Sequence, residues 1–332
     1  MTQKFRLVFY AAVLSVGLVL AASAGLPGAA SAGPTLVVAE YFPDRTRVWE
    51  VSAADFQSRR LVGEIRDPRG YGLNGSVAPD GRTAAYLVWP GRNRPETGAE
   101  LWVLDLRTGG GRRLGADLDL YSAPRWRPDG QAVILRRADY TGRRFGLVEI
   151  DLIGREREVV SAQGAAAAFP VGWDFTGRLV WVSIGPPNEV RLADIPIPLP
   201  EGTPRDFTIA PDGRTLALRL AAPGATRLLT VDLASGLLNP EPGEALVWGP
   251  GPSRTRLADG RLMVGSDGRQ RILGIVGEAT EPLGWDPAGR HLVTRTVKGN
   301  RQQLGLVDAA GAIRSLEFEG YPEFWGWAGG GS

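Results

Sequence analysis

The sequence predicts an all-β fold, a seven-bladed β-propeller preceded by an N-terminal hydrophobic helix. Three observations support this prediction. From residue 35 onward, short β-branched or aromatic runs alternate with Gly, Pro and Asp. A Pro-Asp-Gly turn segment recurs at intervals of about 40 residues, a spacing typical of propeller blades. Unpaired strand-like segments at the two ends of the chain complement one another.

The first 34 residues predict export. Lys4 and Arg6 precede residues 7–24, which form an 18-residue run without charge. Such a run is longer than a usual signal core and matches the shortest membrane spans. Ala-Ser-Ala triplets at 22–24 and 30–32 fit signal cleavage sites. Residues 1–24 are therefore expected to be a signal peptide or a retained membrane anchor, followed by a Gly/Pro/Ala linker at 25–34 and the propeller at 35–332.

Both interpretations place the propeller on the periplasmic or extracellular side. Positive residues ahead of an apolar segment stay in the cytoplasm, and the anchor interpretation is preferred. The protein is then expected to be held at the cytoplasmic membrane through residues 7–24.

The composition excludes many kinds of chemistry. The chain has no Cys, so disulfides, thiolate nucleophiles, Fe–S clusters and thiolate zinc sites are excluded. His291 is the only histidine, so a multi-histidine metal site is impossible. The formal net charge is only +2, which does not favour nucleic acid as a partner.

The repeated turns explain how each blade begins. Segments 77–82, 126–131 and 209–214 share an apolar residue, one variable residue and then Pro-Asp-Gly, and 173–178 and 285–290 are looser copies. Pro presets φ for the turn, and Gly accepts the left-handed conformation that closes a hairpin. Each turn therefore predicts the junction between the first and second strands of a blade.

A later strand of the blade ends in an apolar-Asp-apolar triplet, at 104–106, 150–152 and 231–233, with a shorter copy at 307–308. Together, the Trp-x-Pro-Asp-Gly unit and this strand resemble the PD40, or TolB-like, class of WD40-related propeller repeats over residues 35–332. The resemblance implies the fold but no single function, because such blades occur in translocation proteins, peptidases and binding modules.

The resemblance also marks what this sequence lacks. TolB-type proteins carry an α/β domain before the propeller, propeller peptidases add a hydrolase domain, and neither is expected here. Residues expected of PQQ-type dehydrogenases and of histidine-dependent propeller lyases are missing too. Neither the TolB role nor peptidase activity can therefore be transferred.

Counting the turns gives the number of blades. The seventh candidate inner strand ends at Trp327 and has no following strands, whereas residues 36–41, 47–51 and 59–63 form three strands without an inner one. Joining the chain ends completes a seventh blade and removes open sheet edges. The segment around Trp248 is the least regular, so six blades is the alternative. The other inner strands are expected to end near Pro79, Pro128, Phe175, Pro211, Pro250 and Pro287.

Large aromatic residues recur at the end of the inner strands. One interpretation is a ligand platform around the channel. The preferred one is packing in the wedge between blades, because a position that repeats with the blades serves the architecture. These residues are Trp126, Trp173, Trp248, Trp285 and Trp327.

Other polar residues have structural interpretations. The turn residues Asp80, Asp129 and Asp212 lie on different blades, whereas a calcium ion needs six to eight converging oxygens. His291 has no identifiable catalytic partner, and the glycines at 108–111 lack a P-loop lysine and predict a hairpin turn. No catalytic residue, metal site or cofactor is predicted, and the sequence neither supports nor excludes a cation in the channel.

A propeller has two faces. We letter the four strands of each blade A to D, from the inner strand outward. The AB face carries the turns that join A to B and C to D, and the BC face is the opposite one. Both chain ends are expected on the AB face. The longest loops, which join second to third strands, are expected on the BC face. Arginines and aromatics on long loops fit an interface with a protein partner, although solvated loops explain them as well. The partner-binding residues expected there are Tyr71, Trp89, Arg92, Arg94, Tyr121, Tyr140, Arg143 and Arg144.

These observations favour a non-catalytic, exported propeller, a protein-interaction scaffold or accessory subunit of a membrane or envelope complex. A small-ligand or glycan-binding propeller that uses its channel mouth is the alternative. An enzyme that relies on carboxylates is a third, less favoured interpretation.

Overall fold

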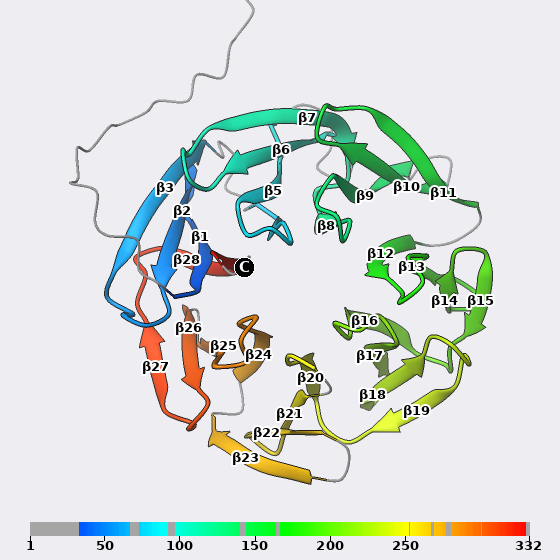
Figure 1. Ribbon diagram of the computed structural model, residues 1–332. Coiled ribbons are helices and arrows are strands. Elements are labelled where there is room, and N and C mark those ends of the chain that lie inside the picture. The colour runs from blue at the N-terminus through cyan, green and yellow to red at the C-terminus, as the bar shows by residue number, and fades with distance from the viewer. Residues whose placement is uncertain are drawn as a thin grey trace, which may run out of the picture.

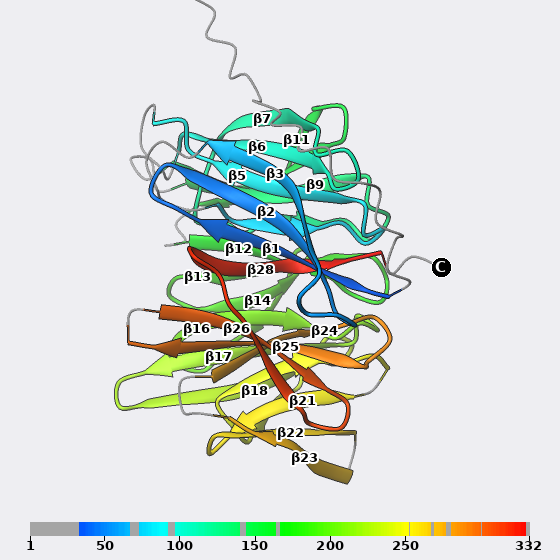
Figure 2. The ribbon, with the colours of Figure 1, turned by 90° about the vertical axis from the view of Figure 1, so that its left-hand side faces the viewer.

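The computed structural model describes residues 33–66, 73–91, 97–139, 144–163, 167–251, 253–266, 269–276, 280–299 and 301–329. Within these ranges the protein is all-β, with 28 strands in seven four-stranded antiparallel sheets. Figure 1 shows the sheets around a common centre, with β8, β12, β16, β20, β24 and β28 innermost. Figure 2 shows the strands running between the two faces of the ring. The all-β propeller prediction is confirmed.

Membrane-spanning helices are not found in the described residues. The predicted N-terminal helix, signal peptide or anchor at residues 1–24 lies outside them.

The first blade closes the ring with strands from both ends of the chain. Its order is β28–β1–β2–β3, so the C-terminal strand is innermost and pairs antiparallel with the first strand. Thr35 faces Ala328 and Tyr41 faces Tyr321 in this pairing. The predicted closure is confirmed. The strands are β28 (Tyr321–Ala328), β1 (Thr35–Tyr41), β2 (Arg45–Ser52) and β3 (Arg59–Arg66).

The second to fourth blades each follow the chain from the inner to the outer strand. The second blade has β4 (Gly75–Val77), β5 (Thr83–Val88), β6 (Ala99–Asp105) and β7 (Gly111–Leu118). The third has β8 (Arg125–Trp126), β9 (Ala132–Asp139), β10 (Arg144–Asp151) and β11 (Glu156–Gln163). The fourth has β12 (Ala167–Trp173), β13 (Leu179–Ile184), β14 (Glu189–Leu192) and β15 (Ile195–Pro198).

The fifth to seventh blades repeat this order. The fifth has β16 (Thr203–Ile209), β17 (Thr215–Ala222), β18 (Ala225–Asp232) and β19 (Leu238–Glu241). The sixth has β20 (Ala245–Trp248), β21 (Arg254–Ala258), β22 (Arg261–Ser266) and β23 (Arg269–Ile275). The seventh has β24 (Thr280–Trp285), β25 (His291–Lys298), β26 (Arg301–Asp308) and β27 (Ile313–Leu316). The irregular segment around Trp248 forms a complete sheet, so the ring has seven blades rather than six.

The pairing of β1 with β28 fixes where the chain enters and leaves the ring. Thr35 begins β1 and lies beside Ala328, which ends β28. The amide N of Gly329 also lies against the turn at Gly81, which joins the first and second strands of the second blade. Both ends of the propeller therefore lie on the AB face.

The tryptophans at the ends of the inner strands lie at contacts between blades. Trp126 is buried, and its indole N–H reaches the inner strand of the preceding blade. Trp173 and Trp327 pack at the edges of two hydrophobic core clusters. These contacts join neighbouring blades, and wedge packing stays the preferred interpretation of the repeated tryptophans. The indole bonds are Trp126 to Ser76 O (3.0 Å), Trp248 to Thr208 O (3.2 Å) and Trp285 to Thr255 Oγ1 (2.9 Å).

Arginines on the outermost strands also join neighbouring blades. In four blades, an arginine near the start of the fourth strand donates a hydrogen bond to a backbone carbonyl in the turn after the third strand of the next blade. We call these residues the interblade arginines. Their bonds are Arg60 to Leu106 O (2.7 Å), Arg112 to Leu152 O (2.5 Å), Arg271 to Ala309 O (2.9 Å) and Arg314 to Ala53 O (3.3 Å).

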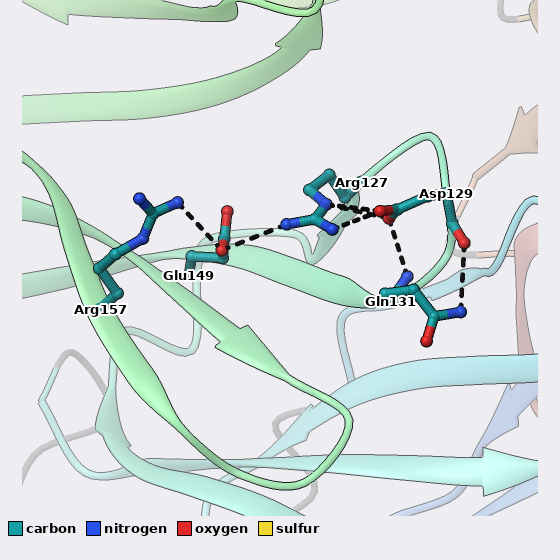
Figure 3. A network of polar contacts seen from close by, with 5 residues as sticks. All are labelled: Arg127, Asp129, Gln131, Glu149 and Arg157. Atoms are coloured by element: carbon teal, nitrogen blue, oxygen red, sulfur yellow. Dashed lines mark hydrogen bonds and ion pairs between the residues drawn. The ribbon is translucent and has the colours of Figure 1, made fainter.

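The aspartates of the repeated turns accept hydrogen bonds within their own turns. The Oδ1 atoms of Asp80, Asp129 and Asp212 each accept the amide N–H of the residue two positions later, at 2.9–3.0 Å. Figure 3 shows that Asp129 also binds the Arg127 guanidinium, which extends the contact to Glu149. These carboxylates stabilise turns, as expected for Asp at such positions.

We expect Asp129 and two aspartates in other turns, Asp105 and Asp232, to make the fold sensitive to acid. The side-chain bond from Arg127 lowers the pKa of Asp129 to about 2, and backbone N–H donors lower the pKa of Asp105 and Asp232. A carboxyl whose pKa is lower in the folded state stabilises the fold above its unfolded pKa of about 3.9, and this contribution is lost as the pH falls through the folded pKa. The melting temperature should therefore drop between about pH 5 and pH 2.

Thermal melts followed by circular dichroism across this pH range test the expectation. The matched variant is Asp105→Asn, Asp129→Asn and Asp232→Asn combined, which keeps acceptor oxygens but removes the titrating charges. Its melting temperature should depend less on pH than that of the parent. An equal acid-induced drop in the variant and the parent would refute this explanation.

Candidate functional site

The residues predicted to bind a partner fall mainly outside the described residues. Tyr71, Arg92, Arg94, Tyr140 and Arg143 lie there, and for Arg144 only the backbone, which begins β10, is described.

The two remaining predicted residues differ. Tyr121 is 51% exposed on the BC face, in the connection from the second to the third blade. Trp89 is only 9% exposed and packs into the core cluster with Leu118 and Leu135. It directly follows β5, and its large apolar surface is buried between the second and third blades. The expectation that Trp89 contacts a partner on an exposed loop is therefore corrected.

The first two strands of the first blade, β28 and β1, bring together a half-buried pair, Tyr41 and Glu323, that the sequence reasoning missed. The hydroxyl of Tyr41, at the end of β1, lies within hydrogen-bond distance of Glu323 Oε2 on β28 and of the Leu73 carbonyl. Its ring stacks on Tyr321, with ring centroids 6.4 Å apart. Burial raises the pKa of the Glu323 carboxyl, although the bond from Tyr41 and the charge of Arg295 oppose this. Burial, followed by the negative charge of Glu323, raises the pKa of Tyr41 well above its usual value.

The number of hydrogen-bond donors at this pair is consistent with the raised pKa of the Glu323 carboxyl. A tyrosine hydroxyl carries one hydrogen, yet it faces two acceptors, Leu73 O and Glu323 Oε2. Both contacts are satisfied when Glu323 is protonated, because the carboxyl then donates to the tyrosine oxygen and the tyrosine donates to Leu73. The pair can thus hold a proton near the inner edge of the first blade.

An acid–arginine chain continues from this pair across the neighbouring blades. Arg295 on β25 pairs with Glu281 on β24 and electrostatically lowers the pKa of Glu323. Glu281 Oε1 also lies 4.0 Å from Arg219 Nη2 on β17, and Arg219 pairs with Asp206 on β16. We call these five residues and Tyr41 the inner network. It joins the fifth, seventh and first blades, toward the BC face.

The third and fourth blades contribute a different combination of side chains. Arg136 on β9 is 4% exposed and forms an ion pair of 2.5 Å with the fully buried Asp119. Its guanidinium also lies 4.3 Å from the centroid of the Phe169 ring on β12. Phe169 in turn approaches Phe207, with centroids 6.1 Å apart. The third and fourth blades thus combine a buried acid–arginine pair with a cation–aromatic contact. The inner network, by contrast, consists of acid–arginine pairs and the contact between Tyr41 and Glu323.

The chemistry available to these groups is limited. No set of three or more His, Cys, Asp or Glu side chains within the described residues is arranged to hold a metal ion. His291 Nδ1 lies 3.1 Å from Oδ2 of the buried Asp286, which also accepts the Arg290 amide in the same turn. His291 therefore stabilises a turn. The titratable groups of the inner network mostly satisfy one another, and burial raises the pKa of both Glu323 and Tyr41.

Comparison with known proteins reveals similarity only at the level of fold. No protein-family model matches the sequence, and no curated protein matches it either. The structure of TolB from Acinetobacter baumannii is similar, with a TM-score of 0.54 and 17% identity over 88% of this chain and 66% of that one. The chain thus spans slightly less than two thirds of that TolB.

Two groups of propeller enzymes are similarly close. A prolyl endopeptidase structure matches with a TM-score of 0.57 and 14% identity, over 87% of this chain and 50% of that one. An oligogalacturonate lyase in complex with manganese matches with a TM-score of 0.56 and 13% identity, over 82% of this chain and 90% of that one. Since TolB, a peptidase and a lyase are about equally similar, the comparisons establish a TolB-like propeller fold that is shared by proteins of different functions.

Proposed function

We propose that this chain is a non-catalytic, exported propeller that serves as a protein-interaction scaffold or accessory subunit of a membrane or envelope complex. The observation that carries the proposal is the position of Thr35 beside Ala328 on the AB face. If residues 7–24 are retained as an anchor, the short linker holds the AB face near the membrane. The BC face, with Tyr121 and the long loops, then points toward partners.

The chemistry of the inner strands supports a binding role over a catalytic one. The only histidine contacts a turn aspartate, and the acids of the inner network are paired with arginines or with Tyr41. A carboxylate-dependent enzyme would need an acid and a base that are both open to a substrate. Among the described residues, the raised pKa of Glu323 is the feature that favours that interpretation.

A small-ligand or glycan-binding propeller is the second candidate. The inner network favours it, because arginine and carboxylate groups at a channel mouth offer charged hydrogen bonds to hydroxyl or anionic groups. A rise in melting temperature with a sugar or a metal ion in solution would support this candidate over the first.

Co-purification from native membranes tests the proposal. The full-length chain should sediment with carbonate-washed membranes and, in mild detergent, should elute with stoichiometric protein partners. A chain lacking residues 1–33 should be folded and soluble, because β1 begins at Thr35. The proposal would be contradicted if the full-length chain were a monomer without bound protein partners in both the membrane fraction and the soluble fraction.

Two variants identify the docking face. The BC-face variant changes Arg92, Arg94, Tyr140 and Arg144 to Ala. The AB-face variant replaces two exposed turn residues, Ile153 (66% exposed) and Leu237 (64% exposed), by Ser. Loss of the partner in the BC-face variant alone is the expected result. Loss in the AB-face variant alone would move the interface to the opposite face.

A further inference from the structure

A cavity of about 490 Å³ opens on the AB face between the sixth and seventh blades. Its walls come from the turn after β20, from β22 and β23, and from the inner strand β24 with its following turn. The volume lies within the range of small-molecule sites. The lining residues with side chains relevant to binding are Pro250, Ser253, Val264, Gln270, Arg271 and Trp285.

Two glycines keep the cavity open. A Cβ at Gly289 would lie 3.1 Å from Pro250 Cγ, and Gly289 has a φ of +68°, which disfavours other residues. A Cβ at Gly249 would lie 3.2 Å from Ser253 Cβ and 3.5 Å from Trp285 Cδ1. Side chains at either position would press on the walls, so the backbone of both turns approaches the opening without filling it.

The walls combine one positive charge with apolar surface. Among the described residues that line the cavity, Arg271 is the only charged one, and none of them carries a carboxylate. Ser253 and Gln270 add neutral hydrogen-bonding groups, while Val264 and Trp285 add apolar surface. A cationic group opposite apolar walls is complementary to an anion that carries an apolar substituent.

Arg271 is held in place by the same kind of hydrogen bond that the other interblade arginines make. Its Nη2 donates 2.9 Å to Ala309 O of the seventh blade, which uses one of the five N–H donors of a guanidinium. The described residues give it no further hydrogen bond. Arg112 makes the equivalent bond between the second and third blades, at 2.5 Å to Leu152 O. Arg271 therefore combines a structural bond with a position in the cavity wall, where a guanidinium can donate to a ligand.

We propose that this cavity binds a carboxylate attached to an apolar group, with Arg271 holding the carboxylate and Trp285 and Val264 contacting the apolar part. Two sources share this chemistry, a free small carboxylic acid and the C-terminal residue of a peptide. The site lies on the AB face, and the proposal does not depend on which protein partner the BC face binds.

Calorimetric titration of the full-length chain in detergent tests the proposal. The probes are phenylacetate, N-acetyl-phenylalanine and N-acetyl-phenylalaninamide, which lacks the carboxylate. At least one of the two acids should bind, and the amide should bind at least about tenfold more weakly than N-acetyl-phenylalanine, as expected when a charged hydrogen bond is lost. Stronger binding of phenylacetate indicates a free acid, whereas stronger binding of N-acetyl-phenylalanine indicates a peptide terminus. Absence of binding by both acids, or equal binding of the amide, would overturn the proposal.

Paired variants separate the charge of Arg271 from its interblade bond. Arg271→Gln should weaken binding of the acids about tenfold or more, and Arg271→Lys should retain part of it. The matched control Arg112→Gln loses an equivalent interblade bond far from the cavity and should bind like the parent. If both Gln variants weakened binding equally, the effect would be structural and the proposal wrong. The amide comparison in the parent decides the question even if Arg271→Gln does not fold.

Discussion

Removal of residues 321–332 is expected to abolish cooperative folding, because it deletes β28 and leaves β1 without its inner partner. Trp325 is lost with this strand. It is 4% exposed and stacks on Tyr86 of the second blade, with centroids 5.9 Å apart. Truncating a single large buried aromatic costs about 3–5 kcal/mol, against a total stability of about 5–15 kcal/mol for a domain.

Thermal unfolding followed by circular dichroism measures the effect of the deletion. Trp325→Ala alone should lower the free energy of unfolding by about 3–5 kcal/mol. Deletion of only residues 330–332, which follow the strand, is the matched control and should leave the melting temperature unchanged. A normal melting temperature after removal of 321–332 would show that β28 does not close the ring.

Substitution of Arg136 by Met is expected to destabilise the protein by about 3–5 kcal/mol, because it removes the guanidinium that compensates the charge of a buried carboxylate. Asp119 is fully buried and pairs with Arg136 at 2.5 Å. The neighbouring Arg137 provides a matched control, since its side chain is 41% exposed and pairs with Glu156 at the surface. Surface pairs of this kind contribute at most about 1 kcal/mol.

Urea unfolding of Arg136→Met and Arg137→Met at neutral pH compares the two ion pairs. The first variant should unfold at a much lower urea concentration, and the second should unfold close to the parent. If Asp119→Asn is combined with Arg136→Met, part of the loss should be recovered, since the buried charge is gone. Equal stability of the two single variants would mean that the Asp119–Arg136 pair is not buried as described.

The features that could be predicted from the sequence depend on local chemistry. The Pro-Asp-Gly turns at 79–81, 128–130 and 211–213 carry their conformational preferences in the turn residues themselves, so the junctions of first and second strands were located correctly. Seven blades and the closing strand followed from counting these turns and from the unpaired strands at the two ends. Such an argument needs no knowledge of distant contacts.

The features that could not be predicted depend on contacts between distant segments. Tyr41 and Glu323 are 282 residues apart, and only the register of β1 against β28 brings them together. Glu281 meets Arg219 only because the ring curves past the sixth blade. Trp89 was expected on a long loop of the BC face, yet the adjoining blade covers its indole. No local signal in the sequence distinguishes these cases.

The positions of the chain ends on the AB face and the meeting of Tyr41 with Glu323 both depend on how β1 pairs with β28, a pairing that begins with Thr35 opposite Ala328. The chain has no Cys, so a disulfide between Thr35→Cys and Ala328→Cys tests this register directly. Facing residues of antiparallel strands have Cα atoms about 4.5–5.5 Å apart, within the range that a disulfide spans. Thr35→Cys with Tyr321→Cys, at the other end of β28, is the control. The account predicts a rapid intramolecular disulfide in the first variant and none in the control, seen by intact mass under oxidising conditions. Free thiols or only intermolecular disulfides in the first variant would contradict it.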